Sequence, residues 1–145
     1  MRKSRTTHTK TKLQAELNKT NVELGQLNHS LATQMITLAA QTGELTPLLD
    51  AVKALRSARN YYTFETNPIE HADVQQALAD TLLMIGKATK DKKVLQKAKQ
   101  AYRAGITVSS MLGDEVMRED LRSNYKLTLA LLGEVTQSKS LFKVA

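Results

Sequence analysis

The three histidines and the scattered carboxylates are the side chains of this sequence that suit metal binding or proton transfer. His8, His29 and His71 lie far apart, without the spacing of metal ligands. His71 and Asp73 are two residues apart, which places them on different faces of a helix, so this pair does not predict a ligand set. The chain has no cysteine, which excludes disulfides and thiolate metal sites. We therefore predict neither a metal nor a cofactor.

Catalytic motifs are also missing from the sequence. Neighbouring carboxylates occur at 114–115 and 119–120, and such pairs suit helix starts and a solvated surface. The glycines stand singly, so none of them forms a phosphate-binding loop. No serine or threonine lies in a nucleophile motif. Because enzyme sites bring several reactive groups together, we predict that this protein is not an enzyme.

Basic residues are unevenly distributed along the chain. The net charge is +7, and five cations without any acid fall within the first 12 residues: Arg2, Lys3, Arg5, Lys10 and Lys12. A second cluster spans residues 87–103, and the basic face predicted for it consists of Lys90, Lys93, Lys97 and Arg103. Basic segments suit nucleic acid or an acidic protein surface. The alternative for residues 1–11 is a flexible, solvated arm.

Apolar residues recur at helical spacing and predict an all-α protein with about five helices. The expected ranges are about 12–41, 45–64, 69–89, 91–111 and 115–135. Gly43, Pro68 and the pair Gly113–Asp114 mark the turns between them, because glycine ends helices and proline opens them. Helix formers are plentiful and hydrophobic residues make up 41% of the chain, which is enough for one packed domain.

The domain organisation follows from these segments. We predict a flexible basic arm at 1–11, a helical domain at 12–137 and a short tail at 138–145. No apolar run approaches the roughly 20 residues of a membrane span, and no apolar segment of a secretory signal follows the N-terminal cations. We expect a cytoplasmic protein without a membrane partner.

The sequence repeats itself at a shift of 47 residues without a gap. Seven identities fall in the 28-residue window that begins at Leu31, where chance gives roughly two. A second shift of 47 matches the chain again near its C-terminus. Amphipathic helices resemble one another by composition alone, but the ungapped third copy favours a true repeat. We predict units at 31–77 and 78–124 and a half-unit at 125–137.

Small residues recur at equivalent positions of this repeat and predict where helices approach closely. They are Ala39, Gly86 and Gly133 in the first helix of each unit, and Ala51 and Ala98 in the second. A glycine inside a helix costs about 1 kcal/mol relative to alanine. Gly86 and Gly133 therefore indicate contacts that are too tight for a methyl group.

The second unit resembles the tetratricopeptide repeat (TPR) family. Its first helix carries Leu82, Ile85, Gly86 and Thr89, and its second carries Ala98, Tyr102 and Gly105, in the spacing of that family. The resemblance covers about 31–136. It departs from the family where Leu82 and Thr89 replace large aromatic residues, where Ser110 replaces proline, and in its period of 47 instead of 34.

The resemblance implies a fold and a function. The fold is a short right-handed solenoid of stacked antiparallel helical hairpins, with the last helix as a cap. The function is that of a scaffold, adaptor or chaperone-like module that binds a protein or peptide partner. Transferred position by position, the family's concave groove would be lined by Ile36, Ala40, Leu83, Lys87, Leu127 and Ala130.

The character of this implied groove is apolar. The Lys, Arg and Asn residues with which some family members clamp a peptide carboxylate are absent, and apolar residues such as Met84 stand there instead. Such a groove suits an amphipathic helix or an extended apolar segment. The alternative is that the protein's own termini cover these residues.

A heptad of leucines predicts self-association. Leu17, Leu24, Leu31 and Leu38 are spaced by seven, with Leu13 and Leu27 at the other seam position of a coiled coil. Thr20 and Gln34 interrupt that second seam position. A homodimer through Leu17, Leu24 and Leu31 is one interpretation, and a leucine cover over the first repeat is the other.

A nucleic-acid-associated protein is the alternative function. It would use the basic arm at 1–11 and the lysine-rich segment 87–103. The basic stretch before the leucines is shorter than the readout helix of basic-zipper proteins and lacks its Asn and Arg residues, which disfavours sequence-specific DNA binding.

Overall fold

Five α-helices make up the protein in the computed structural model, which describes the backbone of residues 2–144 and the side chains of residues 5–138. The helices are α1 (Arg2–Thr42), α2 (Thr46–Tyr61), α3 (Pro68–Thr89), α4 (Lys92–Leu112) and α5 (Glu115–Val144). The described backbone contains no strand. The predictions of an all-α protein and of about five helices are confirmed.

The turn signals act as predicted. Gly43 and Gly113 end their helices with φ angles of 73° and 70°, which glycine adopts without steric cost. Pro68 is the first residue of α3. The Asp114 side chain accepts a hydrogen bond from the Met117 amide at 3.0 Å, so it caps the start of α5.

The outer ends of the first and last helices were predicted wrongly. α1 begins at Arg2 instead of residue 12, so most of the predicted arm is helical. Residues 2–11 contain neither proline nor glycine, and the Thr9 and Thr11 hydroxyls donate to carbonyls four residues earlier. α5 continues to Val144 instead of ending near 135 and includes most of the predicted tail. The side chains of 139–145 lie outside the described residues.

Two helix ends that lie 47 residues apart share the same hydrogen-bond pattern. The Thr42 hydroxyl donates to the Leu38 carbonyl and accepts from the Glu44 amide. Thr89 makes the same two bonds, to the Ile85 carbonyl and from the Asp91 amide. Residues 43 and 90 both have a positive φ. The third copy has Gln137 at that position and no turn, which explains why α5 continues.

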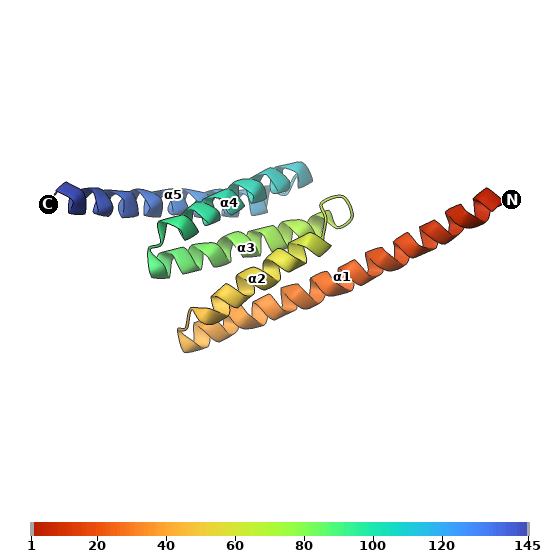
Figure 1. The fold of residues 1–145 in the computed structure, drawn as a ribbon. Helices are drawn as coiled ribbons and strands as arrows, with labels where there is room; N and C mark the ends of the chain where they lie inside the picture. Colours follow the sequence, from red (N-terminus) through yellow and green to blue (C-terminus); the bar gives the residue numbers. More distant parts are fainter. Residues whose placement is uncertain (1, 145) are drawn as a thin grey trace.

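The helices pack as consecutive antiparallel neighbours (Figure 1). The α1–α2 and α3–α4 hairpins have the most extensive contacts, and α5 covers α4. The predicted units 31–77 and 78–124 begin inside α1 and α3, so the hairpins do not coincide with these units. The N-terminal half of α1 extends beyond the other helices (Figure 1), and every described side chain from 5 to 20 is exposed.

The core lies along the hairpin interfaces and contains the predicted small residues. Ala51 and Ala98 are fully buried, Ala39 is 7% exposed, and Tyr102 is fully buried. A Cβ atom at Gly86 would overlap the Leu95 side chain, with Leu95 Cγ only 2.9 Å away. The prediction of a tight contact at Gly86 is confirmed.

The equivalent prediction at Gly133 is wrong. Gly133 is exposed, and a Cβ atom there would meet no atom within 4 Å. No second helix follows α5 in the described chain, so the position that corresponds to Gly86 has no hairpin partner. A second tight contact, at Gly25, was not predicted: its Cβ would lie 2.7–2.8 Å from the Tyr62 ring.

Candidate functional site

An apolar pocket lies where the α1–α2 turn meets the last turns of α3. Its volume is about 310 Å³. The lining residues are almost all apolar, and Glu44 is the one charged residue among them: Ile36, Ala39, Ala40, Gly43, Glu44, Leu45, Leu48, Met84 and Ala88. Met84 is 39% exposed. This apolar pocket presents hydrophobic surface from the first helices of two successive hairpins.

The structure brings together only part of the groove that the resemblance implied. Ile36 and Ala40 line the apolar pocket. Leu83 is 5% exposed and belongs to the core, so its assignment to a partner-binding surface is wrong. The helical period turns its side chain inward, whereas the next residue, Met84, faces the pocket. Lys87 is exposed on α3 but does not line the pocket.

The α5 positions of the implied groove lie elsewhere. Leu127 and Ala130 are exposed on α5, and α5 contributes no residue to the apolar pocket. α5 packs mainly on α4 and contacts α3 only slightly. The first helices of the three predicted units, α1, α3 and α5, therefore do not line one continuous groove.

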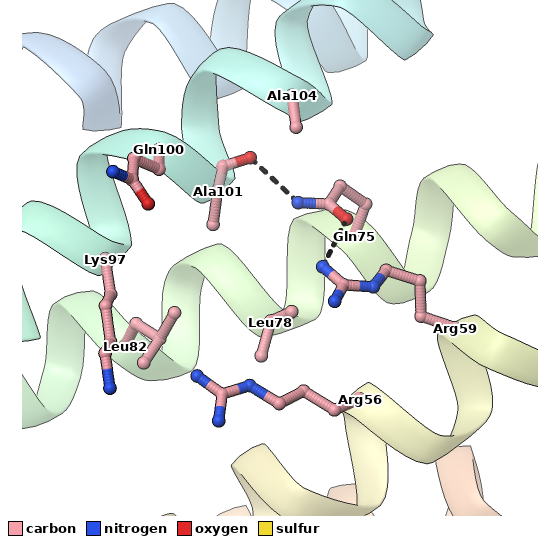
Figure 2. A pocket seen from close by; sticks show the side chains of 9 residues that line it. All are labelled: Arg56, Arg59, Gln75, Leu78, Leu82, Lys97, Gln100, Ala101 and Ala104. Atoms are coloured by element: carbon pink, nitrogen blue, oxygen red, sulfur yellow. Dashed lines mark hydrogen bonds between the residues drawn. The ribbon is translucent and has the colours of Figure 1, made fainter.

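A second pocket lies between α2 and α4, with α3 as its floor (Figure 2), and we call it the basic cleft. Its volume is about 300 Å³. Its lining combines three cations with two amides and four apolar residues: Arg56, Arg59, Gln75, Leu78, Leu82, Lys97, Gln100, Ala101 and Ala104. Figure 2 shows Arg56 reaching into the cleft from α2 and Lys97 from α4. No carboxylate is among the lining residues.

A buried glutamine organises one side of the basic cleft. Gln75 is 3% exposed, and its Nε2 donates to the Ala101 carbonyl at 3.0 Å. This bond fixes the amide so that its oxygen faces Arg59, whose Nη1 donates to Gln75 Oε1 at 3.4 Å. Arg59 is thus positioned by a residue that is itself anchored to α4 (Figure 2).

The predicted basic face does not form a single surface with this cleft. Lys97 lines the cleft, whereas Lys90, Lys93 and Arg103 do not. Arg103 follows Lys97 by six residues, which places it roughly 120° around α4. All four side chains are exposed.

The heptad leucines form a stripe along α1, and all of them except the partly buried Leu24 are exposed. We call this set the leucine stripe, and its members are Leu13, Leu17, Leu24, Leu27, Leu31 and Leu38. Leu13, Leu17 and Leu27 are 59%, 52% and 67% exposed. The residues of α1 that face the other helices are different ones, among them Val22, Ala32 and Ala39. The interpretation that these leucines cover the first repeat is therefore wrong for the exposed members.

A polar network joins α3, α4 and α5 beneath the surface. The Tyr102 hydroxyl donates to Asp80 Oδ1 at 2.6 Å, and Asn124 Nδ2 donates to the same oxygen at 3.2 Å. Burial, followed by the bond to and the charge of Asp80, raises the pKa of Tyr102 well above its ordinary value. The network therefore connects three helices through one carboxylate oxygen.

The described part of the chain shows neither a metal cluster nor a membrane-spanning helix. Within residues 5–138, no group of three or more His, Asp or Glu side chains is arranged to hold a metal ion. No described helix combines the length and the apolar character needed to cross a membrane.

No protein-family model matches the chain, and neither a curated protein nor a solved structure matches it.

Sequence reasoning missed most of the basic cleft. Of its lining residues, only Lys97 was among the predicted binding residues, and Arg56, Arg59 and Gln100 carried no signal in the sequence. The lining residues lie on three helices and become neighbours only when the hairpins pack. One signal was available: Gln75 stands at helical spacing from Ala72 and Ala79, on an apolar face, and an amide buried there needs hydrogen-bond partners.

Proposed function

We propose that this chain is a cytoplasmic helical-repeat interaction module, similar to the TPR family, that binds a protein partner in the apolar pocket. The observation that carries the proposal is the pocket's apolar lining, drawn from α1, the α1–α2 turn, α2 and α3. In this proposal the hairpins stack as a short right-handed solenoid that α5 caps. The repeated turn geometry at Thr42 and Thr89 supports a repeat architecture.

The pocket's chemistry defines the partner. Its volume of about 310 Å³ is at the lower end of ligand pockets, which suits a few aliphatic side chains better than a large cofactor. Amphipathic helices place such side chains three and four residues apart and dock them in apolar grooves. Glu44 at the rim favours a partner with a cation beside its apolar residues. We therefore propose an amphipathic segment with an apolar face and a flanking Lys or Arg.

Met84→Glu is expected to weaken partner binding at least tenfold. A carboxylate in the apolar pocket either loses water or excludes the partner's side chains, and both effects oppose binding. The measurement is affinity purification of the tagged full chain from its native host, followed by a Kd for the recovered segment.

Met111→Glu is the matched control for this experiment. Met111 is 62% exposed on α4 and does not line the pocket, so the same substitution there should leave binding unchanged. Thermal unfolding should show both variants folded, because both side chains are exposed. Equal recovery and equal affinity for wild type and Met84→Glu would sink the assignment of the pocket.

We also propose that two copies pair through the leucine stripe. The spacing of seven places its members on one seam, which is the geometry of helix pairing. The stripe continues along the part of α1 that no other helix covers (Figure 1). Isolated helices are marginal in water. Pairing with the same seam of a second α1 would therefore stabilise the uncovered part of α1.

Leu27→Glu is expected to raise the dimer dissociation constant at least tenfold. The substitution places a charge at the seam in both copies, where it loses water on association. Sedimentation equilibrium should give twice the chain mass of 16.1 kDa for wild type and a shift to monomer for the variant. Leu49→Glu is the control, because Leu49 is 49% exposed on α2, outside the stripe. A monomeric wild-type protein at high concentration would contradict the proposal.

A further inference from the structure

The cations of the basic cleft lack counter-charges. The ion pairs of the described chain join Arg118 to Glu115 and Arg122 to Glu119, both within α5. Arg56, Arg59 and Lys97 pair with no carboxylate in this part of the chain, and none lines the cleft. Cations that lie together in one pocket repel one another. An anion bound between them adds attractive interactions that offset this repulsion.

The cleft also holds a donor in position. Gln75 fixes one guanidinium nitrogen of Arg59, and the remaining N–H groups of that side chain are left for a ligand. Arginine presents its donors in a planar fork that matches the two oxygens of a carboxylate. Gln75 is itself buried and bonded to Ala101. It therefore orients the Arg59 side chain before a ligand arrives, which reduces the side-chain entropy lost on binding.

The rest of the lining indicates which kind of anion fits. Leu78 and Leu82 form a floor beside Ala101 and Ala104, so a ligand with aliphatic groups next to its charges would bury apolar surface. The lining has no aromatic side chain, and stacking on aromatic side chains is what usually holds single-stranded nucleic acid. The volume of about 300 Å³ accommodates a few side chains.

We propose that the basic cleft binds a carboxylate-bearing protein segment, with Arg56, Arg59 and Lys97 holding its acidic side chains above the apolar floor. The site uses α2, α3 and α4 and shares no residue with the apolar pocket. It adds a second recognition surface, specific for acidic sequence, to the proposed function.

Fluorescence anisotropy with a labelled ten-residue peptide of alternating Glu and Leu tests this proposal. Arg56→Gln, Arg59→Gln and Lys97→Gln should each weaken binding about five- to tenfold, because each removes a charge-assisted hydrogen bond. Arg103→Gln is the matched control: it removes the same charge from an exposed residue of α4 outside the cleft. We expect less than a twofold effect from this control.

Comparisons between peptides, variants and nucleic acid decide the outcome. A peptide with Gln in place of Glu should not bind, and Met84→Glu should leave binding of the acidic peptide unchanged, so a failure of the apolar pocket does not affect this test. Equal losses for Arg56→Gln and Arg103→Gln would show a non-specific effect of the net charge and overturn the proposal. Tighter binding of a ten-nucleotide single-stranded DNA, weakened by the same cleft substitutions, would overturn it in favour of nucleic acid. No measurable peptide binding at low salt would also overturn it.

Discussion

Leu95→Ala is expected to lower the free energy of unfolding by about 2–5 kcal/mol, as buried leucine truncations do. Leu95 is fully buried in the α3–α4 hairpin, and its side chain lies directly against the backbone of Gly86. The substitution removes apolar contacts and leaves a cavity that the two helices close only in part. Urea unfolding followed by circular dichroism measures the change.

Gly86→Ala extends this prediction to the other side of the contact. Alanine is the better helix former by about 1 kcal/mol, but its Cβ would overlap the Leu95 side chain. We expect a net loss of about 1–3 kcal/mol from overpacking. In the Leu95→Ala background the methyl group has room, so Gly86→Ala should become neutral or stabilising.

Gly133→Ala is the control, since the sequence repeat assigns Gly133 to the same position as Gly86. Its Cβ would meet nothing within 4 Å, so we expect stabilisation of up to about 1 kcal/mol from helix propensity. Additive effects of Gly86→Ala and Leu95→Ala, or the same sign for the two glycine substitutions, would contradict the packing seen here.

Tyr102→Phe is expected to cost about 1.5–3 kcal/mol, the range for hydrogen bonds to charged groups. The substitution removes the bond to Asp80 and leaves that carboxylate, which is partly buried, with only the Asn124 donor of this network. Tyr125→Phe is the matched control, because Tyr125 is also partly buried and its hydroxyl makes no hydrogen bond in the described chain. That control should change stability by less than about 0.5 kcal/mol.

The raised pKa of Tyr102 gives the same substitution a pH signature. Below pH 10 the tyrosine is protonated in both the folded and the unfolded chain, so it contributes no pH dependence. Above pH 10 the unfolded chain releases this proton and the folded chain retains it, because burial and Asp80 oppose the phenolate. The free energy of unfolding should then fall by about 1.4 kcal/mol per pH unit on account of this group.

Urea unfolding of wild type and Tyr102→Phe between about pH 9 and pH 11 isolates this contribution. The lysines and the other tyrosines titrate in both proteins, so the difference between the two curves belongs to Tyr102. The variant's deficit should shrink as the pH rises above 10. Parallel curves would show that the folded chain does not hold this proton.

Local signals in the sequence predicted the elements well. Gly43, Pro68 and Gly113 each need a particular backbone conformation, and that need is visible in the residue itself. The predicted ends of α3 and α4 therefore lie within one residue of the structure. The outer ends of α1 and α5 failed for the opposite reason, since polar residues without proline or glycine permit both helix and coil.

The repeat, by itself, determined which residues are equivalent but not which of them have a partner. Gly86 and Gly133 are the same position in sequence, and only the hairpin that follows Gly86 makes its contact tight. Leu83 and Met84 are adjacent, and the packing of α3 decided that Leu83 is core while Met84 lines the apolar pocket.

The basic cleft depended wholly on tertiary structure, because Arg59, Gln75 and Ala101 come from three helices and meet only when these pack. Sequence thus determined helices, turns and the leucine stripe, which depend on neighbours within one helix, whereas pockets depend on distances between helices that no local pattern encodes.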